Sequence, residues 1–203
     1  MCRKGKPVIP YSREEKHWID FFAVVADRVI KYLRPKTALD IGCAKGFLVE
    51  SLRDRGVEAF GVDLSEYAIG EVRADIKPYC SVKSILQIAE RDRYDLVVCI
   101  EVLEHLTEED GIKALQKITR LSDRILFSAS SDDFDEPTHI NVRPVSYWMD
   151  RFAEFGFVPV KSFRAKFISN DAVLFRKRRT VSGVIKRALK RLRGRFRLFV
   201  PIG

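Results

Sequence analysis

The stretch Ala38-Leu-Asp-Ile-Gly-Cys-Ala-Lys-Gly46 decides the fold. The apolar run Thr37 to Ile41 leads into it, and a helical pattern from about Gly46 to Arg53 leads out of it. Gly42 lets the backbone bend and approach a ligand, and Gly46 permits close packing where the helix opens. The stretch is therefore predicted to be a strand-to-helix turn that binds a nucleotide-like ligand.

Strand and helix patterns alternate on the C-terminal side of this turn. Apolar runs of strand length lie at 57–62, 79–82, 94–100 and 124–129, and helical patterns lie at 66–74, 85–91 and 108–121. Near-continuous apolar strands separated by helices are typical of a parallel sheet that is covered on both faces. The pattern predicts an α/β protein with a doubly wound, Rossmann-like sheet.

The segments outside this alternation set the predicted boundaries. Ser12 and Glu15 have the spacing of a capping box, which predicts a helical lid in residues 1–36 that ends at Pro35. Pro144 suits the first turn of a helix, and two apolar runs at 157–163 and 167–175 suit an antiparallel pair. The main domain is therefore predicted to cover 37–176, followed by an extension at 177–203.

Composition fits a globular protein of the cytosol. The 203 residues are 46% hydrophobic and 32% charged, which is enough to build one sizeable core. No run reaches the roughly 18 apolar residues of a membrane span, and the first residues lack a signal-peptide pattern. The four cysteines have neither disulfide-framework nor zinc spacing, so we expect reduced thiols and assign no metal ligand.

Two aspartates make the turn more specific than its glycines do. Asp40 lies inside the turn, where a carboxylate suits a cation and would repel a pyrophosphate. Asp63 ends the next predicted strand, about where a ribose diol needs a bidentate acceptor. Each aspartate alone also fits ordinary turn chemistry. A nicotinamide-binding sheet is the nearest competitor, and Asp40 argues against it.

With the strand signature Tyr94 to Leu106, these motifs resemble the class I S-adenosylmethionine-dependent methyltransferases over roughly residues 37–130. Within that class the sequence is similar to the broad methyltransferase-domain group that includes the ubiquinone-biosynthesis O-methyltransferases. The resemblance implies a seven-stranded sheet, mostly parallel with an antiparallel last strand, and S-adenosyl-L-methionine as cofactor.

The resemblance also implies the cofactor contacts. The turn residues would face the methionine part, Asp63 would hold the ribose hydroxyls, Leu64 would flank the adenine, and two residues after the fourth strand would lie beside the methyl-donor end. The turn residues are Asp40, Gly42, Cys43, Ala44 and Gly46, and the two residues at the methyl-donor end are Glu101 and Val102.

Two positions depart from the family pattern. Ala44 replaces the usual central glycine, which is tolerable where its φ stays below zero. The acid often found after the third strand is missing, so adenine would be recognised by backbone groups or by Ser84.

Three side chains are candidates for catalysis. His139 lies in the loop after the fifth predicted strand, over the edge where open α/β sheets bind ligands, and imidazole titrates near neutrality. We predict His139 as the base, with His105 supporting the floor of the site and Glu101 beside the reacting methyl group. The nearby acids Asp132, Asp133, Asp135 and Glu136 fit a solvated loop better than a cation site.

The predicted reaction is O-methylation of a hydroxyl on a small molecule, a sugar or a lipid-linked intermediate. The Asn/Asp-Pro-Pro-aromatic segment that grips planar amines is missing after the fourth strand. The alternatives are an RNA methyltransferase and a cofactor-binding subunit without catalysis. The sequence predicts neither the acceptor nor the oligomeric state.

The C-terminal extension carries most of the positive charge. Residues 176–203 hold eleven Lys and Arg and no acid, whereas the remaining residues hold 26 basic and 28 acidic side chains. From Val181 onward, apolar residues recur at the spacing of one helical face. A cationic amphipathic helix at 180–200 suits an anionic membrane surface, such as the inner face of a cell membrane. Nucleic acid explains the charge but not the apolar face, and packing against the body or a partner is the third alternative.

Overall fold

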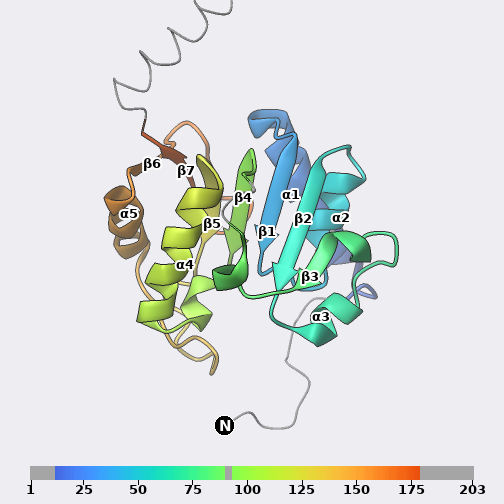
Figure 1. The fold of residues 1–203 in the computed structure, drawn as a ribbon, viewed down its shortest axis with the longest axis horizontal. Coiled ribbons are helices and arrows are strands. Elements are labelled where there is room, and N and C mark those ends of the chain that lie inside the picture. The colour runs from blue at the N-terminus through green and yellow to red at the C-terminus, as the bar shows by residue number, and fades with distance from the viewer. Residues whose placement is uncertain (1–11, 90–92, 179–203) are drawn as a thin grey trace, which may run out of the picture.

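The computed structural model describes residues 12–89 and 93–178, which form a layered α/β structure around one seven-stranded sheet (Figure 1). The spatial order of the strands is β3-β2-β1-β4-β5-β7-β6. The strands are β1 (Thr37–Ile41), β2 (Glu58–Asp63), β3 (Cys80–Val82), β4 (Leu96–Ile100), β5 (Arg124–Ser128), β6 (Phe157–Pro159) and β7 (Val173–Lys177).

The first five strands run parallel, and β7 runs antiparallel to both of its neighbours, β5 and β6. In the centre, Asp40 of β1 lies opposite Gly61 of β2 and Val98 of β4. The predicted fold class and the antiparallel end of the sheet are confirmed. Because the parallel strands end at one edge, the loops after β1, β2, β4 and β5 meet there.

Helices cover both faces of the sheet, and Figure 1 shows α4 and α5 on one side with α1 and α2 on the other. The helices are α1 (Lys16–Leu33), α2 (Phe47–Arg53), α3 (Glu66–Gly70), α4 (Glu108–Leu121) and α5 (Val145–Glu154), with short 3-10 turns η1 (Lys77–Tyr79), η2 (Ile85–Gln87) and η3 (Leu103–His105). Successive strand residues feed two separate cores: Val97 packs with Ile118 of α4, and Val98 packs with Val25 and Leu48 of α1 and α2.

The start of α1 differs from the prediction. The helix begins at Lys16 with Glu15 as its cap residue, and no side chain caps it. The hydroxyl oxygen of Ser12 accepts a hydrogen bond from the backbone N–H of Glu14 at 3.2 Å. The capping-box prediction is therefore wrong, because the Ser12 side chain stabilises a turn before the helix.

The predicted C-terminal strands are shorter than expected. Only Phe157–Pro159 and Val173–Lys177 pair, because Phe163, Phe167 and Ile168 between them turn away to pack against the α1 side of the core. The ring of Phe163 lies edge-on to Tyr32 of α1, with 6.2 Å between ring centroids. The backbone N–H of Arg178 still donates to the carbonyl of Gly156 at 2.7 Å, so the ordered pairing runs just past the expected boundary at 176.

Cys43, Cys80 and Cys99 are buried free thiols, as expected for these three. Across the described ranges, none of the helices combines the length and apolarity that a bilayer crossing requires. The amphipathic helix predicted at 180–200 lies outside the described residues.

Candidate active site

The turn after β1 is fastened to the neighbouring strand by its own backbone. The N–H groups of Gly42 and Cys43 both donate to the carbonyl of Val62, at 2.8 and 3.1 Å. Gly42 has a φ of +74°, and a Cβ there would collide with a methyl group of Val102. Glycine is therefore required at this position for both its conformation and the close approach of the segment after β4.

Ala44 occupies the left-handed region, with a φ of +45°. The negative φ that was set as the condition for a tolerable alanine is therefore not observed. Its N–H donates to a carboxylate oxygen of Asp63 at 2.8 Å, and this bond holds the peptide in the conformation that glycine would adopt more easily.

Asp63 ties the turn to the end of β2. One oxygen accepts from Ala44 and the other accepts from the N–H of Ser65 at 2.8 Å. Each carboxylate oxygen has a second lone pair, and the side chain is half-buried, so Asp63 can still accept from a diol. It therefore organises the turn while remaining able to bind a ribose.

The residues predicted to flank adenine surround Asp63. Leu64 is 66% exposed, which leaves an apolar surface beside the turn. Ser84 caps η2: its hydroxyl oxygen accepts from the N–H of Leu86, and its own N–H donates to the Gln87 side chain. The Ser84 backbone donor is thus engaged, and its hydroxyl hydrogen is what it could offer a base.

Asp40 is buried under the turn. Burial, helped by the charge of Asp63, raises the pKa of Asp40 from 3.8 to about 8. A ligand cation close by would favour its ionised form, and a phosphate would do the opposite. These features fit a positively charged nucleoside such as S-adenosyl-L-methionine. The turn at Gly42 allows a ligand to come close to the backbone, each Asp63 oxygen keeps a free lone pair, and Asp40 is a buried acid.

Glu101 follows β4 in a strained conformation, with a φ of +53°. Its carboxylate accepts a hydrogen bond from the hydroxyl of Ser128 at 2.6 Å. Glu104 lies behind it, fully buried, and accepts from the N–H of Ser130 at 2.9 Å. Burial and the neighbouring Glu101 raise the pKa of Glu104 to about 8.

His105 and His139 lie together, with 4.7 Å between ring centroids. Their Nδ1 atoms donate to the carbonyls of Thr138 and Asp133, at 3.2 and 2.9 Å, which leaves each Nε2 with a lone pair when neutral. Burial, followed by the charge of His139, lowers the pKa of His105.

These two imidazoles and Glu104 form a cluster that could hold a metal ion, since one ligand atom from each lies within 4.8 Å of the others. The second carboxylate oxygen of Glu104 is buried and has no hydrogen-bond partner among the described residues. Asp133 of the acidic loop lies beside this cluster, with a carboxylate oxygen 3.6 Å from Nδ1 of His139.

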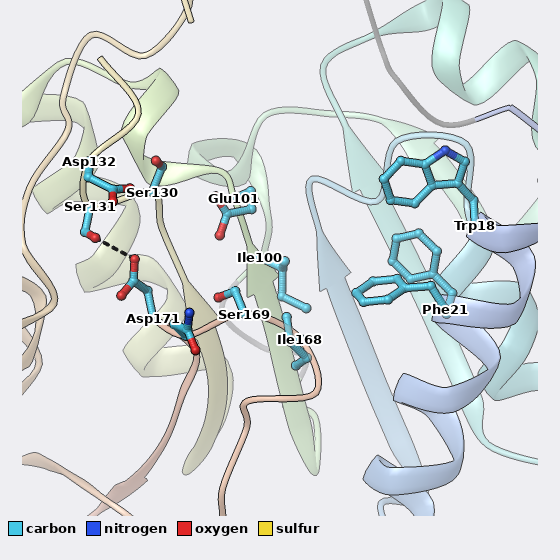
Figure 2. Close-up of a pocket in the computed structure, with 12 residues that line it drawn as sticks. Trp18, Phe21, Ile100, Glu101, Ser130, Ser131, Asp132, Ile168, Ser169 and Asp171 are labelled. Atoms are coloured by element: carbon cyan, nitrogen blue, oxygen red, sulfur yellow. Dashed lines mark hydrogen bonds between the residues drawn. The ribbon is translucent and has the colours of Figure 1, made fainter. Parts of the chain in front are cut away.

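A pocket of about 480 Å³ opens beside the end of β4 (Figure 2). Glu101 lines it, whereas His105 and His139 do not. Figure 2 shows aromatic rings of α1 on one side and polar groups on the other. The twelve lining residues are Trp18, Phe21, Phe22, Ile100, Glu101, Ser130, Ser131, Asp132, Ile168, Ser169, Asn170 and Asp171.

Sequence reasoning missed two walls of this pocket. Trp18, Phe21 and Phe22 belong to the predicted N-terminal helical lid and were not predicted as site residues, yet they border the pocket. The segment 168–171 was predicted as strand and instead turns across the site. An aromatic cluster near the start of α1 was the available signal for the first wall. The turn-forming residues Ser169, Asn170 and Asp171 were the available signal for the second.

Comparison with known proteins agrees with this geometry. Residues 12–162 match the family model described as a methyltransferase domain. A ubiquinone biosynthesis O-methyltransferase of Burkholderia vietnamiensis is 33% identical over 131 residues, which cover 61% of this chain and 53% of that protein. The chain thus spans about half the length of the curated relatives it matches.

Solved structures show the same fold. Magnesium protoporphyrin IX methyltransferase of Synechocystis PCC 6803, solved with bound SAM, has a TM-score of 0.62 at 19% identity, covering 83% of this chain and 85% of that one. The N-methyltransferase NodS of Bradyrhizobium japonicum has a TM-score of 0.63 at 18% identity, covering 83% of this chain and 100% of that one. On its motifs, fold and family match, the chain belongs to the methyltransferase-domain family of class I S-adenosylmethionine-dependent methyltransferases.

Proposed function

We propose that this chain transfers a methyl group from S-adenosyl-L-methionine to a hydroxyl of a small molecule bound in the pocket beside Glu101. The observation that carries the proposal is the position of Glu101, which lines the pocket and follows directly from β4, the strand beside the Gly42 turn. The cofactor, when bound, supplies an electrophilic methyl on a charged sulfur with a good leaving group. The protein then has to align the acceptor and remove its proton. Sugar and lipid-linked hydroxyls are narrower forms of the same proposal.

Cofactor binding is the first step to test. Titration calorimetry should show binding of S-adenosyl-L-methionine by the wild type, and Asp63→Ala should abolish it, because both the turn and the diol acceptor are lost. Asp20→Ala is the matched control, since Asp20 pairs with Lys16 on the exposed side of α1. Unchanged affinity in Asp63→Ala would contradict the proposed cofactor site.

The proton acceptor is the second step. We propose Glu101 as the group that receives the hydroxyl proton in the pocket, because Glu101 lines the pocket and His139 does not. His139 then has a secondary role. Glu101→Gln should lower turnover by about 10² to 10⁴-fold, the usual contribution of a general base. His139→Ala should lower turnover less. A larger loss in His139→Ala would restore His139 as the base.

A divalent cation at Glu104, His105 and His139 is a second candidate for assisting deprotonation, favoured by the unpartnered oxygen of Glu104. Two imidazoles and a carboxylate suit a transition metal. Elemental analysis of the purified protein, before and after dialysis against a chelator, tests this candidate. No bound metal, together with full turnover after dialysis, would exclude it.

We also propose that the basic extension holds the protein on an anionic membrane surface. Each Lys or Arg near such a surface contributes about 1 kcal/mol. Removal of residues 180–203 leaves β7 and its contact at Arg178 intact and should abolish flotation with phosphatidylserine vesicles. Retained flotation argues against this proposal. Steeply salt-dependent RNA binding that is lost with the same residues would favour the RNA alternative.

A further inference from the structure

We propose that the pocket selects an acceptor with an aromatic ring and a positively charged alkylamine, and that it rejects anionic acceptors. This inference rests on the proposed function in one respect, because it takes the pocket to be the acceptor site. The volume of about 480 Å³ falls within the range of small-molecule sites. The two walls of the pocket define what fits there.

One wall is aromatic. The rings of Trp18 and Phe21 lie edge to face, with 6.3 Å between centroids, and Phe21 and Phe22 do the same at 5.1 Å. Phe22 also stacks on Phe47 at the start of α2, at 5.9 Å and 21°, which fixes the wall to the turn that binds the cofactor. A rigid wall of ring faces binds flat rings and organic cations.

The facing wall is acidic. Glu101, Asp132 and Asp171 line the pocket, and none of its twelve lining residues is a lysine, an arginine or a histidine. Asp171 accepts a hydrogen bond from the hydroxyl of Ser131 at 2.6 Å, which fixes its carboxylate on the polar side of the pocket, opposite the aromatic rings (Figure 2). None of the three acids forms an ion pair with a basic side chain in the part of the chain that the structure describes. A carboxylate or phosphate on the acceptor would meet like charge with no compensating cation.

A buried hydroxyl adds a polar anchor. The Oγ atom of Ser169 is buried at the pocket wall and has no hydrogen-bond partner among the described residues. Such a group costs free energy until something bonds to it. An amine or hydroxyl of the acceptor can supply that bond. The pocket therefore combines aromatic faces, uncompensated acids and an unpartnered hydroxyl. Together they match an acceptor with an aromatic ring and an alkylammonium group.

Three phenols that differ in charge test the proposal: tyramine, 4-ethylphenol and 4-hydroxyphenylacetate. Binding is measured by titration calorimetry of the full chain with S-adenosylhomocysteine present, and methyl transfer is measured with labelled cofactor. Tyramine should bind tightest and the anion weakest, with a difference of roughly tenfold or more between these two. Equal affinities, a preference for the neutral or anionic phenol, or no binding by any of the three would overturn the proposal.

Asparagine variants test the charge of the acidic wall, because they remove the charge and keep the size of the side chain. The double variant Asp132→Asn, Asp171→Asn should lower the tyramine preference, with the remainder due to Glu101, whereas Asp135→Asn, in the same loop but outside the pocket lining, should keep it in full. An undiminished preference in the double variant contradicts the role of these two acids. If tyramine binds tightest but no methyl transfer follows, the result contradicts the proposed hydroxyl methylation alone. If methyl transfer occurs with no preference for charge, the result contradicts this inference alone.

Discussion

Asp63 illustrates why the sequence predicts which residues belong to the site but does not predict all of their contacts. Its place after an apolar strand predicted a role at the cofactor. That it also holds the left-handed peptide of Ala44 depends on two loops meeting in space. The same holds for Glu104, whose burial and clustering with two histidines arise from the packing of the loop around residue 139.

Ala44→Gly should stabilise the protein, although glycine usually destabilises. A left-handed alanine costs roughly 1–2 kcal/mol, and glycine removes that cost. Glycine also loses more chain entropy on folding, which offsets part of the stabilisation. We expect the free energy of unfolding in urea to rise by about 0.5 kcal/mol. Ala114→Gly, within the buried face of α4, should lower it instead. A loss of stability in both variants would mean that Ala44 carries no strain.

Asp40 should make stability depend on pH. Its pKa in the folded protein is raised, so its stabilising protonated form is lost as the pH rises from about 4 to 8. The free energy of unfolding should therefore fall over this window by up to about 1.4 kcal/mol per pH unit more in the wild type than in Asp40→Asn. Parallel pH profiles for the two proteins would show that Asp40 is ionised throughout.

The same titration should appear in cofactor binding. A cationic ligand favours the ionised form of Asp40, so binding below pH 8 should release a proton. Calorimetry at pH 7 in two buffers of different ionisation enthalpy measures that release. The Asp40→Asn variant serves as the control and should release less; equal release from both proteins would assign the proton to another group.

At the scale of elements, the bounds of β1 and α4 match the prediction. The helix α4 has one apolar face with a helical period, and β1 is a short apolar run that ends at a glycine turn. The elements that came out much shorter than predicted are α3, η2, β6 and β7, and they lie where tertiary packing decides. The stretch from Phe163 to Ile168 is as apolar as a strand, yet it packs as a loop on α1. Periodicity does not distinguish these two uses of apolar residues.

The returning strand β7 depends on one aromatic stack. Phe175 is fully buried and lies parallel to Phe152 of α5, with 4.0 Å between centroids. Phe175→Ala should lower the free energy of unfolding by about 3–5 kcal/mol, and Phe175→Leu by much less. Val173→Ala, at the half-buried start of the strand, is the control. Equal losses for the two alanine variants in urea denaturation would argue that the stack is unimportant.

At the scale of the whole molecule, the sheet order brings the Gly42 turn, Asp63, Glu101 and the pocket to one edge. Because parallel strands end at the same edge of a sheet, the meeting of these loops was predictable once the strands were assigned. The pocket itself was not, because its aromatic wall belongs to α1, which precedes the sheet in sequence and packs beside β4 only in three dimensions.

The antiparallel course of β7 determines where the end of this strand lies relative to the pocket. Since β7 runs against β5, its last residues lie at the amino ends of the parallel strands (Figure 1). The pocket is lined by Glu101 and Ser130, which follow the opposite ends of β4 and β5. If the proposed membrane attachment holds this pole against a bilayer, the mouth of the pocket faces the aqueous phase. Such an orientation would let dissolved acceptors arrive freely and would keep the reacting end of a short lipid headgroup out of reach.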